Sequence, residues 1–191
     1  MIEGILIAVL VVLLVWGVVI FNRLVRARNL VRNGFADIDV QLQRRHDLVP
    51  QLVEAVRAYS GHEQRVLEEV TALRSRAKQA EGEQRAQAMA GAEVALAAGL
   101  GRLLLLAEDY PELKATENFR QLTRELVETE DLLSHARRFY NGAVRDLNTR
   151  IQQFPDLLVA RLMGFEEATF FSAEIEARSA PQVAGLLRGS D

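Results

Sequence analysis

The residues best suited to chemistry gather in one short segment, RRHDLVPQLV, which begins at Arg44. Arg45, His46 and Asp47 place a guanidinium, an imidazole and a carboxylate side by side, and Pro50 follows three residues after Asp47. One interpretation is an active site that uses His46 and Asp47. The other is structural, because a proline normally ends or kinks a helix and Asp47 stands where it would cap a helix that restarts at Pro50.

The other histidines complete no familiar site. The chain has three histidines, namely His46, His62 and His135. A di-iron helical bundle requires a glutamate three residues before a histidine on two helices, and none of these histidines has one. His62-Glu63 starts like a zinc-protease motif, but Val66 occupies the position of its second histidine. Phosphate-binding, dinucleotide-binding and nucleophile-elbow motifs are also missing, as is cysteine, so we predict a protein that is no enzyme and holds no cofactor or metal.

An acidic cluster later in the chain is a second candidate site, in this case for a cation. Its members are Glu125, Glu128, Glu130 and Asp131. Arginines flank the cluster on both sides, at Arg124, Arg137 and Arg138. An exposed helix face crossed by salt bridges is therefore the favoured interpretation.

Arg45 occupies an apolar position of a long helical repeat. Between residues 21 and 77, apolar side chains recur at alternating steps of three and four, which is typical of a helix that presents one seam to partner helices. The charged residues at seam positions are Arg28, Arg45 and Glu63. A guanidinium in such a seam needs a carboxylate or must reach solvent, and Asp47 points away from it. We predict that Arg45 pairs across the bundle with Glu130 and fixes the register of the helices.

The first element that must position these residues is a membrane anchor. Residues 4–21 carry no charge, and eighteen helical residues at ~1.5 Å each reach about 27 Å, enough for the core of a bilayer. A cleaved signal peptide would have basic residues before the apolar run and a small-x-small site after it. Here Glu3 precedes the run and Asn22-Arg23 follow it. We therefore predict that residues 1–21 form an uncleaved transmembrane helix.

The orientation of this helix follows from the basic residues beside it. Four juxtamembrane arginines follow the span and none precedes it; they are Arg23, Arg26, Arg28 and Arg32. By the positive-inside rule the N-terminus lies outside and the rest of the chain is cytoplasmic. Setting the topology is the favoured role of these arginines, and binding anionic lipid head groups is the second.

The remainder of the chain is predicted to be all-α. The first helix reverses near Gly82, a second helix covers residues 85–107, a third covers about residues 116–153, and a short helix follows Pro155. The apolar run near residue 104 resembles another span, but the charges at Glu93 and Arg102 favour a packed bundle helix. The predicted fold is a transmembrane helix that continues into an elongated up-and-down bundle of three to four long antiparallel helices. This bundle covers residues 22–172, and residues 173–191 form a tail for which disorder is one interpretation.

Helix lengths constrain how the bundle closes. A straight helix over residues 22–80 would be ~88 Å long, whereas its partners would be ~35 and ~57 Å. The first helix must therefore break near Pro50 or Gly61 and fold back, or leave part of its seam for another copy. We expect self-association through its membrane-proximal part. A net charge of −3 excludes the strongly basic surface of a nucleic-acid-binding protein.

Several ordered motifs resemble the LemA family of bacterial membrane proteins. They are FNRLVRARNLVRNGFADIDVQLQRRHDLVPQLVEAV, EDYPELKATENFRQL, ETE, ARRFYN and FPDLLVARLMGF, and together they cover nearly all of residues 21–171. The chain departs mildly from the family at Gly34-Phe35, where Ala-Trp is usual, and at Gln43, where Lys is common. The resemblance implies an anchored helical bundle in the bacterial inner membrane, with no established reaction and with links to internal-membrane organisation and membrane metalloproteases.

These features together predict a membrane-anchored helical-bundle scaffold that self-associates at the cytoplasmic face of the inner membrane. Organisation of the membrane itself would be consistent with that role. The alternative is an adaptor or regulator of a membrane-bound metalloprotease. The two differ in stoichiometry, because a scaffold forms a homo-oligomer alone and an adaptor needs its partner.

Overall fold

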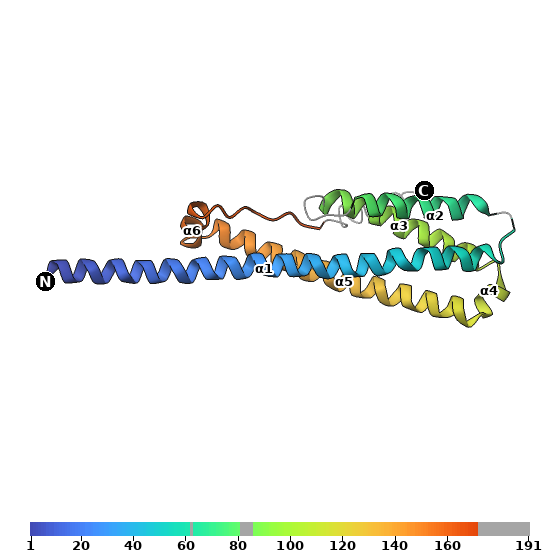
Figure 1. Ribbon diagram of the computed structural model, residues 1–191, viewed down its shortest axis with the longest axis horizontal. Helices are drawn as coiled ribbons and strands as arrows, with labels where there is room; N and C mark the ends of the chain where they lie inside the picture. The colour runs from blue at the N-terminus through green and yellow to red at the C-terminus, as the bar shows by residue number, and fades with distance from the viewer. Residues whose placement is uncertain (62, 81–85, 172–191) are drawn as a thin grey trace, which may run out of the picture.

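The computed structural model describes residues 1–61, 63–80 and 86–171 and confirms the all-α fold, since these residues contain six helices and no strand. The helices are α1 (Ile2–Arg57), α2 (Gln64–Gln79), α3 (Ala86–Ala107), α4 (Pro111–Ala115), α5 (Glu117–Gln152) and α6 (Asp156–Leu162). Figure 1 shows α1, α5 and the α2–α3 pair lying along one common axis. The predicted chain reversal at Gly82 and the tail 173–191 fall outside the described residues.

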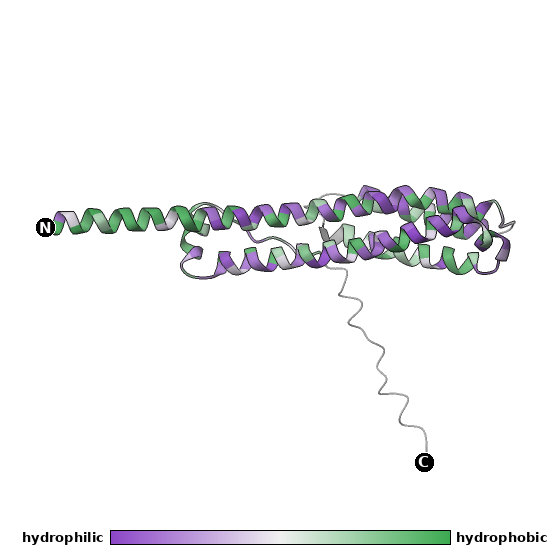
Figure 2. Cartoon of the chain, turned by 90° about the horizontal axis from the view of Figure 1, so that it is seen from below, coloured by the Kyte–Doolittle hydropathy of each residue, from purple (hydrophilic) through white to green (hydrophobic). Residues whose placement is uncertain are grey.

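The longest element, α1, is one continuous helix that leaves the bundle at its N-terminal end (Figure 1). Its first part is strongly hydrophobic and projects beyond every other helix (Figure 2). Nearly all side chains before Ile20 are exposed, and from Ile20 onward one face of α1 is buried. The exposed part is long and apolar enough to cross a membrane.

The bundle has two apolar cores, each built around α1. The proximal core lies nearer the N-terminal segment and joins α1 residues 20–42 to α5 residues 133–151. The distal core joins α1 residues 48–56 to α2, to α3 and to the first half of α5. α5 runs antiparallel beside α1 through both cores, as the apolar repeat predicts (Figure 1).

The break of the first helix falls at the second of its two predicted positions. α1 ends at Arg57, and after a short connection through Gly61 the chain returns as α2. The N–H groups of Tyr59 and Ser60 both donate to the carbonyl of Val56, which closes the last turn. The alternative break at Pro50 is wrong, because α1 continues through that residue.

The α2–α3 pair covers the distal half of α1. α3 passes the same length and hydropathy test for a membrane span as the N-terminal segment, but it packs one face into the bundle through Leu96, Leu100 and Leu103. Its Arg102 pairs with Glu69 of α2. α3 is therefore a bundle helix in this structure, as predicted from its charges.

After α6 an extended segment, residues 165–171, returns along the proximal core. Two asparagines of α5 hold its backbone as a neighbouring strand would. Asn148 donates to Ala168 O and accepts from Ala168 N, both at 2.9 Å. Asn141 bonds Phe171 O and N in the same way at 3.1 and 2.9 Å. This segment and α5 cover the proximal seam of α1, so the helix folds back near Gly61 and the alternative of a seam left open is wrong.

Candidate functional site

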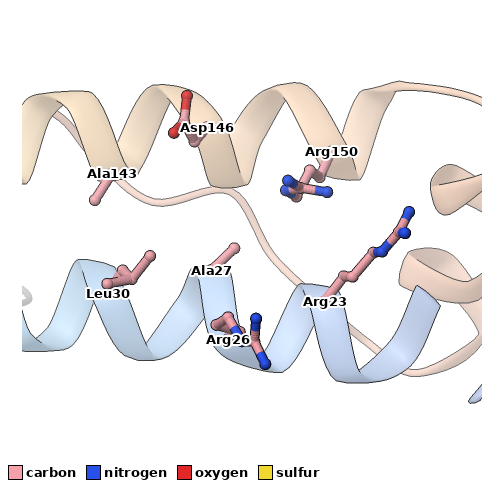
Figure 3. Close-up of a pocket in the computed structure, with 7 residues that line it drawn as sticks. All are labelled: Arg23, Arg26, Ala27, Leu30, Ala143, Asp146 and Arg150. Carbon is pink, nitrogen blue, oxygen red and sulfur yellow. The ribbon is translucent and has the colours of Figure 1, made fainter. Parts of the chain in front are cut away.

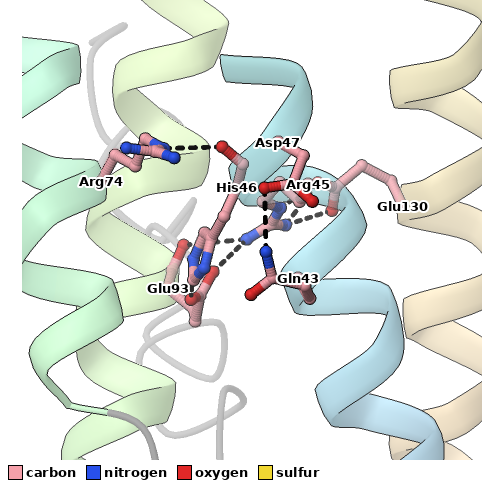
Figure 4. Close-up of polar contacts among 7 residues, drawn as sticks. All are labelled: Gln43, Arg45, His46, Asp47, Arg74, Glu93 and Glu130. Carbon is pink, nitrogen blue, oxygen red and sulfur yellow. Dashed lines mark hydrogen bonds and ion pairs between the residues drawn. The ribbon is translucent and has the colours of Figure 1, made fainter. Parts of the chain in front are cut away.

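A buried polar layer separates the two apolar cores. Its fully or almost fully buried members are Arg45 and His46 of α1, Glu93 of α3 and Thr129 of α5. Arg45 Nε donates to Glu130 Oε1 at 2.6 Å, and Arg45 Nη1 donates to Glu93 Oε2 at 2.7 Å (Figure 4). Glu130 is the partner predicted for Arg45, and Glu93 is a second partner from another helix. One guanidinium thus joins three helices.

Glu93 is shared between two side chains of α1. Its Oε2 accepts from Arg45, and its Oε1 lies 2.8 Å from His46 Nε2 (Figure 4). A carboxylate without exposed surface is costly unless it is paired and hydrogen-bonded. These two contacts meet that requirement on both oxygens.

A second arginine of α5 lies close to the layer. Burial lowers the pKa of Arg137, and the charge of Arg45 lowers it further, while Glu130 and Glu93 oppose the shift. The guanidinium of Arg137 also lies 5.1 Å from the ring centroid of Phe171, in the segment that follows α6. Arg137 thus places a further guanidinium near the carboxylates of Glu130 and Glu93.

α1 runs through Pro50 without a break, so Pro50 does not restart the helix and the predicted capping role of Asp47 is wrong. Proline has no N–H, so the carbonyl four residues earlier, at His46, loses its helical partner. Arg74 of α2 replaces that partner, because its Nε donates to His46 O at 2.6 Å (Figure 4). Asp47 has no helix end to cap, and it accepts instead from Gln43 Nε2 at 2.8 Å.

Two of the predicted seam charges lie elsewhere. Arg28 is exposed, because the neighbouring Ala27 takes the buried position, and its guanidinium lies 5.0 Å from the ring centroid of Phe165. Glu63 lies after the end of α1, at the start of α2. A hydrogen bond to Glu63 raises the pKa of Tyr110, the residue before α4. The polar layer therefore contains Arg45 and Glu130 but neither Arg28 nor Glu63.

Glu93, Thr129 and Arg74 are residues of the layer that the sequence did not lead us to predict there. Glu93 carried a usable signal, because it is the single acid of the mostly apolar helix α3 and a buried acid needs a cation. Arg74 gave no such signal in the sequence. It donates to the backbone carbonyl of His46, which lacks its helical donor because Pro50 has no N–H. The acidic cluster does not converge, and no group of three metal-ligating side chains forms among the described residues.

The layer holds three of its charged or titratable side chains inside the bundle, while the side chain of Glu130 is 38% exposed. His46 and Glu93 have no exposed surface, and Arg45 is 1% exposed. Asp47 is exposed, and its carboxylate accepts from Gln43 (Figure 4). The arrangement is an internal ion-pair network that holds α1, α3 and α5 in one register.

Two of the juxtamembrane arginines line an open groove of about 370 Å³ beside the proximal core (Figure 3). Arg23 and Arg26 come from α1, and Arg150 with Asp146 come from α5. Arg150 lies 3.7 Å from Asp156 of α6. In the described chain neither Arg23 nor Arg26 forms an ion pair.

A long helix with an exposed apolar end, packed into an antiparallel bundle around an internal ion pair, defines an elongated helical-bundle protein with one apolar extension. The chain belongs to the LemA family, whose sequence profile matches residues 34–184. The protein LemA of Metamycoplasma hominis is 25% identical over 156 residues, which are 81% of this chain and 70% of that protein.

The magnetosome proteins MamQ are also similar to this chain. MamQ 1 and MamQ 2 of Paramagnetospirillum magneticum are each 32% identical over 85 residues, or 44% of this chain. The match covers 31% of each MamQ protein, so the chain aligns with about a third of their length.

Proposed function

We propose that this protein is a membrane-anchored scaffold whose bundle self-associates at the cytoplasmic face of a bacterial inner membrane. The observation that supports the anchored scaffold is the continuity of α1, and self-association is the part of the proposal that the mass measurement below tests. The same helix supplies the exposed apolar segment and one wall of both cores, without a flexible linker between them. Any movement of the anchor is therefore transmitted directly to the bundle.

The internal ion-pair layer supports a mechanical role. A buried network of charges contributes little net stability compared with apolar packing, but wrong registers would leave its charges unpaired. Arg45 contacts α3 and α5 simultaneously, so a slip of either helix breaks a charged contact. Such a bundle keeps one shape under load, which a scaffold requires.

Self-association is tested by the mass of the full-length protein in nanodiscs at micromolar concentration. We expect a defined homo-oligomer in the absence of any other protein, and imaging would show whether it is a ring, a cage or a filament. A monomer that assembles only with a membrane metalloprotease would replace the scaffold by the adaptor.

Topology is tested separately with single cysteines, since the natural chain has none. In intact cells a membrane-impermeant maleimide should label Ile2→Cys at the outer side. It should label Arg57→Cys at the far end of α1 only after lysis. The reverse pattern would place the bundle outside and would contradict the cytoplasmic assignment.

A further inference from the structure

An apolar groove of about 450 Å³ lies between the N-terminal segment and α6. Its lining residues come from both helices and are Leu14, Gly17, Val18, Phe21, Val159, Leu162 and Met163. Gly17 contributes to the groove by its size, since no atom lies within 4 Å of the point where its Cβ would stand. The groove is open along one side, and no charged side chain lines it.

The outer surface of α6 and its flanks is also apolar. Phe154, Leu158, Leu162 and Met163 are 72%, 60%, 79% and 54% exposed. These four lie within ten residues of one another in the chain, at one end of the bundle (Figure 1). Single exposed apolar residues are ordinary, but a contiguous group beside an apolar groove marks a binding surface.

Four charged residues lie in or shortly after α6, namely Asp156, Arg161, Glu166 and Glu167. The side chain of Asp156 is mostly buried and lies 3.7 Å from Arg150 at the end of α5. Arg161 is exposed, and its long aliphatic stem allows the guanidinium to reach the head-group layer. The groove that contains Arg23, Arg26 and Arg150 begins just beyond Phe21.

The position of α6 along α1 sets its depth relative to a bilayer. If residues 4–21 span the hydrocarbon, its cytoplasmic boundary lies near Phe21. The groove extends along α1 to Leu14, which at ~1.5 Å per residue is about 10 Å inside that boundary. Amphipathic helices that lie in a membrane interface bury their apolar face about 5–10 Å deep.

We propose that α6, together with Phe154 and Met163, is immersed in the cytoplasmic leaflet, and that a phospholipid acyl chain fills the groove between α6 and α1. The occupant is lipid because the wall formed by Leu14, Gly17 and Val18 belongs to the segment that crosses the bilayer, where acyl chains are the solvent. The inference rests on the proposed membrane anchor and adds a second, peripheral attachment to it.

Attachment through both the spanning helix and α6 has a different mechanical effect from attachment through the spanning helix alone. A single spanning helix can tilt and rotate in the bilayer. A short helix that enters the leaflet beside it prevents rotation about the axis of α1 and restricts tilt. The bundle is then held in one orientation to the membrane surface.

The test uses three single-cysteine variants of the full-length protein in nanodiscs of phosphatidylcholine and phosphatidylglycerol, each carrying a nitroxide. Leu162→Cys reports on α6, Val18→Cys on the anchor, and Leu105→Cys is the matched control. Leu105 is also an exposed leucine, at 66% against 79% for Leu162, and it lies on α3 of the bundle. The readout is the accessibility of the nitroxide to oxygen, which concentrates in lipid, and to a water-soluble nickel chelate.

We expect the labels at Leu162 and Val18 to be accessible to oxygen and protected from the nickel chelate, and the label at Leu105 to behave in the opposite way. A label at Leu162 that matches Leu105, while Val18 remains in lipid, overturns this inference alone. If the label at Val18 is itself in water, both the anchor and the inference fail.

A second copy of the chain on α6 would produce a distinct result. The label at Leu162 would then be protected from both reagents, and its spectrum would show dipolar broadening that disappears on dilution with unlabelled protein. That outcome also overturns the proposed lipid occupant.

Discussion

At the scale of single residues, Arg45 is the side chain on which most of the polar layer depends. Its replacement by Met leaves Glu93, which has no exposed surface, without its cation. Breaking a buried charged pair by removing one partner costs about 3–5 kcal/mol. We expect Arg45→Met to lower the free energy of unfolding by that amount, measured by urea denaturation in detergent.

The neighbouring residue provides a matched control for Arg45. Arg44 also pairs with an acid of α5, at 3.5 Å from Glu128, but both side chains of this pair are largely exposed. Exposed pairs contribute roughly 0–1 kcal/mol, so Arg44→Met should have little effect. Equal stabilities of the Arg45 and Arg44 variants would mean that Arg45 is solvated in the folded protein.

Pro50 and Arg74 are coupled through one carbonyl oxygen. Arg74→Ala leaves His46 O without the donor that replaces the missing N–H of Pro50, and an unpaired buried acceptor costs about 1–3 kcal/mol. In a Pro50→Ala background the helix itself supplies the donor, so the same change should cost less. Denaturation of the two single variants and the double variant gives the coupling energy, and additive effects would contradict the exchange of donors.

Which residues form the layer could be predicted only in part from the sequence. Arg45 and Glu130 were predictable because an interrupted apolar repeat requires a charge partner on another helix. The restart of the helix at Pro50 was wrongly predicted. The donor that replaces the missing N–H of Pro50 comes from Arg74 on another helix, and no local sequence pattern indicates such a donor. Arg28 was misplaced by one residue, since a straight helix of 3.6 residues per turn drifts from a strict heptad repeat.

At the scale of elements, the close approach of α1 and α5 depends on Gly34. A Cβ at this position would lie 3.0 Å from Phe139 Cδ1 and 3.1 Å from Tyr140 Cα, so a side chain there meets the backbone of α5. We expect Gly34→Leu to force the two helices apart and to destabilise the bundle by about 1–3 kcal/mol. Thermal unfolding followed by circular dichroism measures this loss.

Gly142, on the opposing helix, is the control for Gly34. No atom lies within 4 Å of a Cβ built there, and leucine is a better helix former than glycine. Gly142→Leu should therefore leave the melting temperature unchanged or raise it slightly. A destabilised Gly142 variant beside a stable Gly34 variant would contradict the packing of α1 on α5.

The order and type of the long helices were predictable, but the cover of the proximal core was not. Apolar spacing and the N-cap at Thr116 set the seam and the start of α5, and Thr116 Oγ1 does accept from Phe119 N. The extended segment 165–171 has no comparable periodicity. Side chains of Asn141 and Asn148 hold it through backbone contacts, and such contacts leave no repeat in the sequence.

At the scale of the whole molecule, the continuity of α1 and the immersion of α6 together predict a bundle that stands away from the membrane. α1 is a single helix from the apolar segment to Arg57. The height of a residue above the bilayer is therefore proportional to its position along α1. A hinge between anchor and bundle would remove this relation. The orientation of the bundle is thus the property in which a rigid scaffold differs most from a tethered domain.

Height is measurable by energy transfer from single labelled cysteines to acceptor lipids in a nanodisc. Val40→Cys and Arg57→Cys place exposed labels on the same helix, seventeen residues apart. At ~1.5 Å per residue the Arg57 label should stand about 25 Å farther from the head groups than the Val40 label. Similar heights for the two labels would mean that α1 lies along the membrane surface, and the bundle would then expose a long side to the lipid instead of its proximal end.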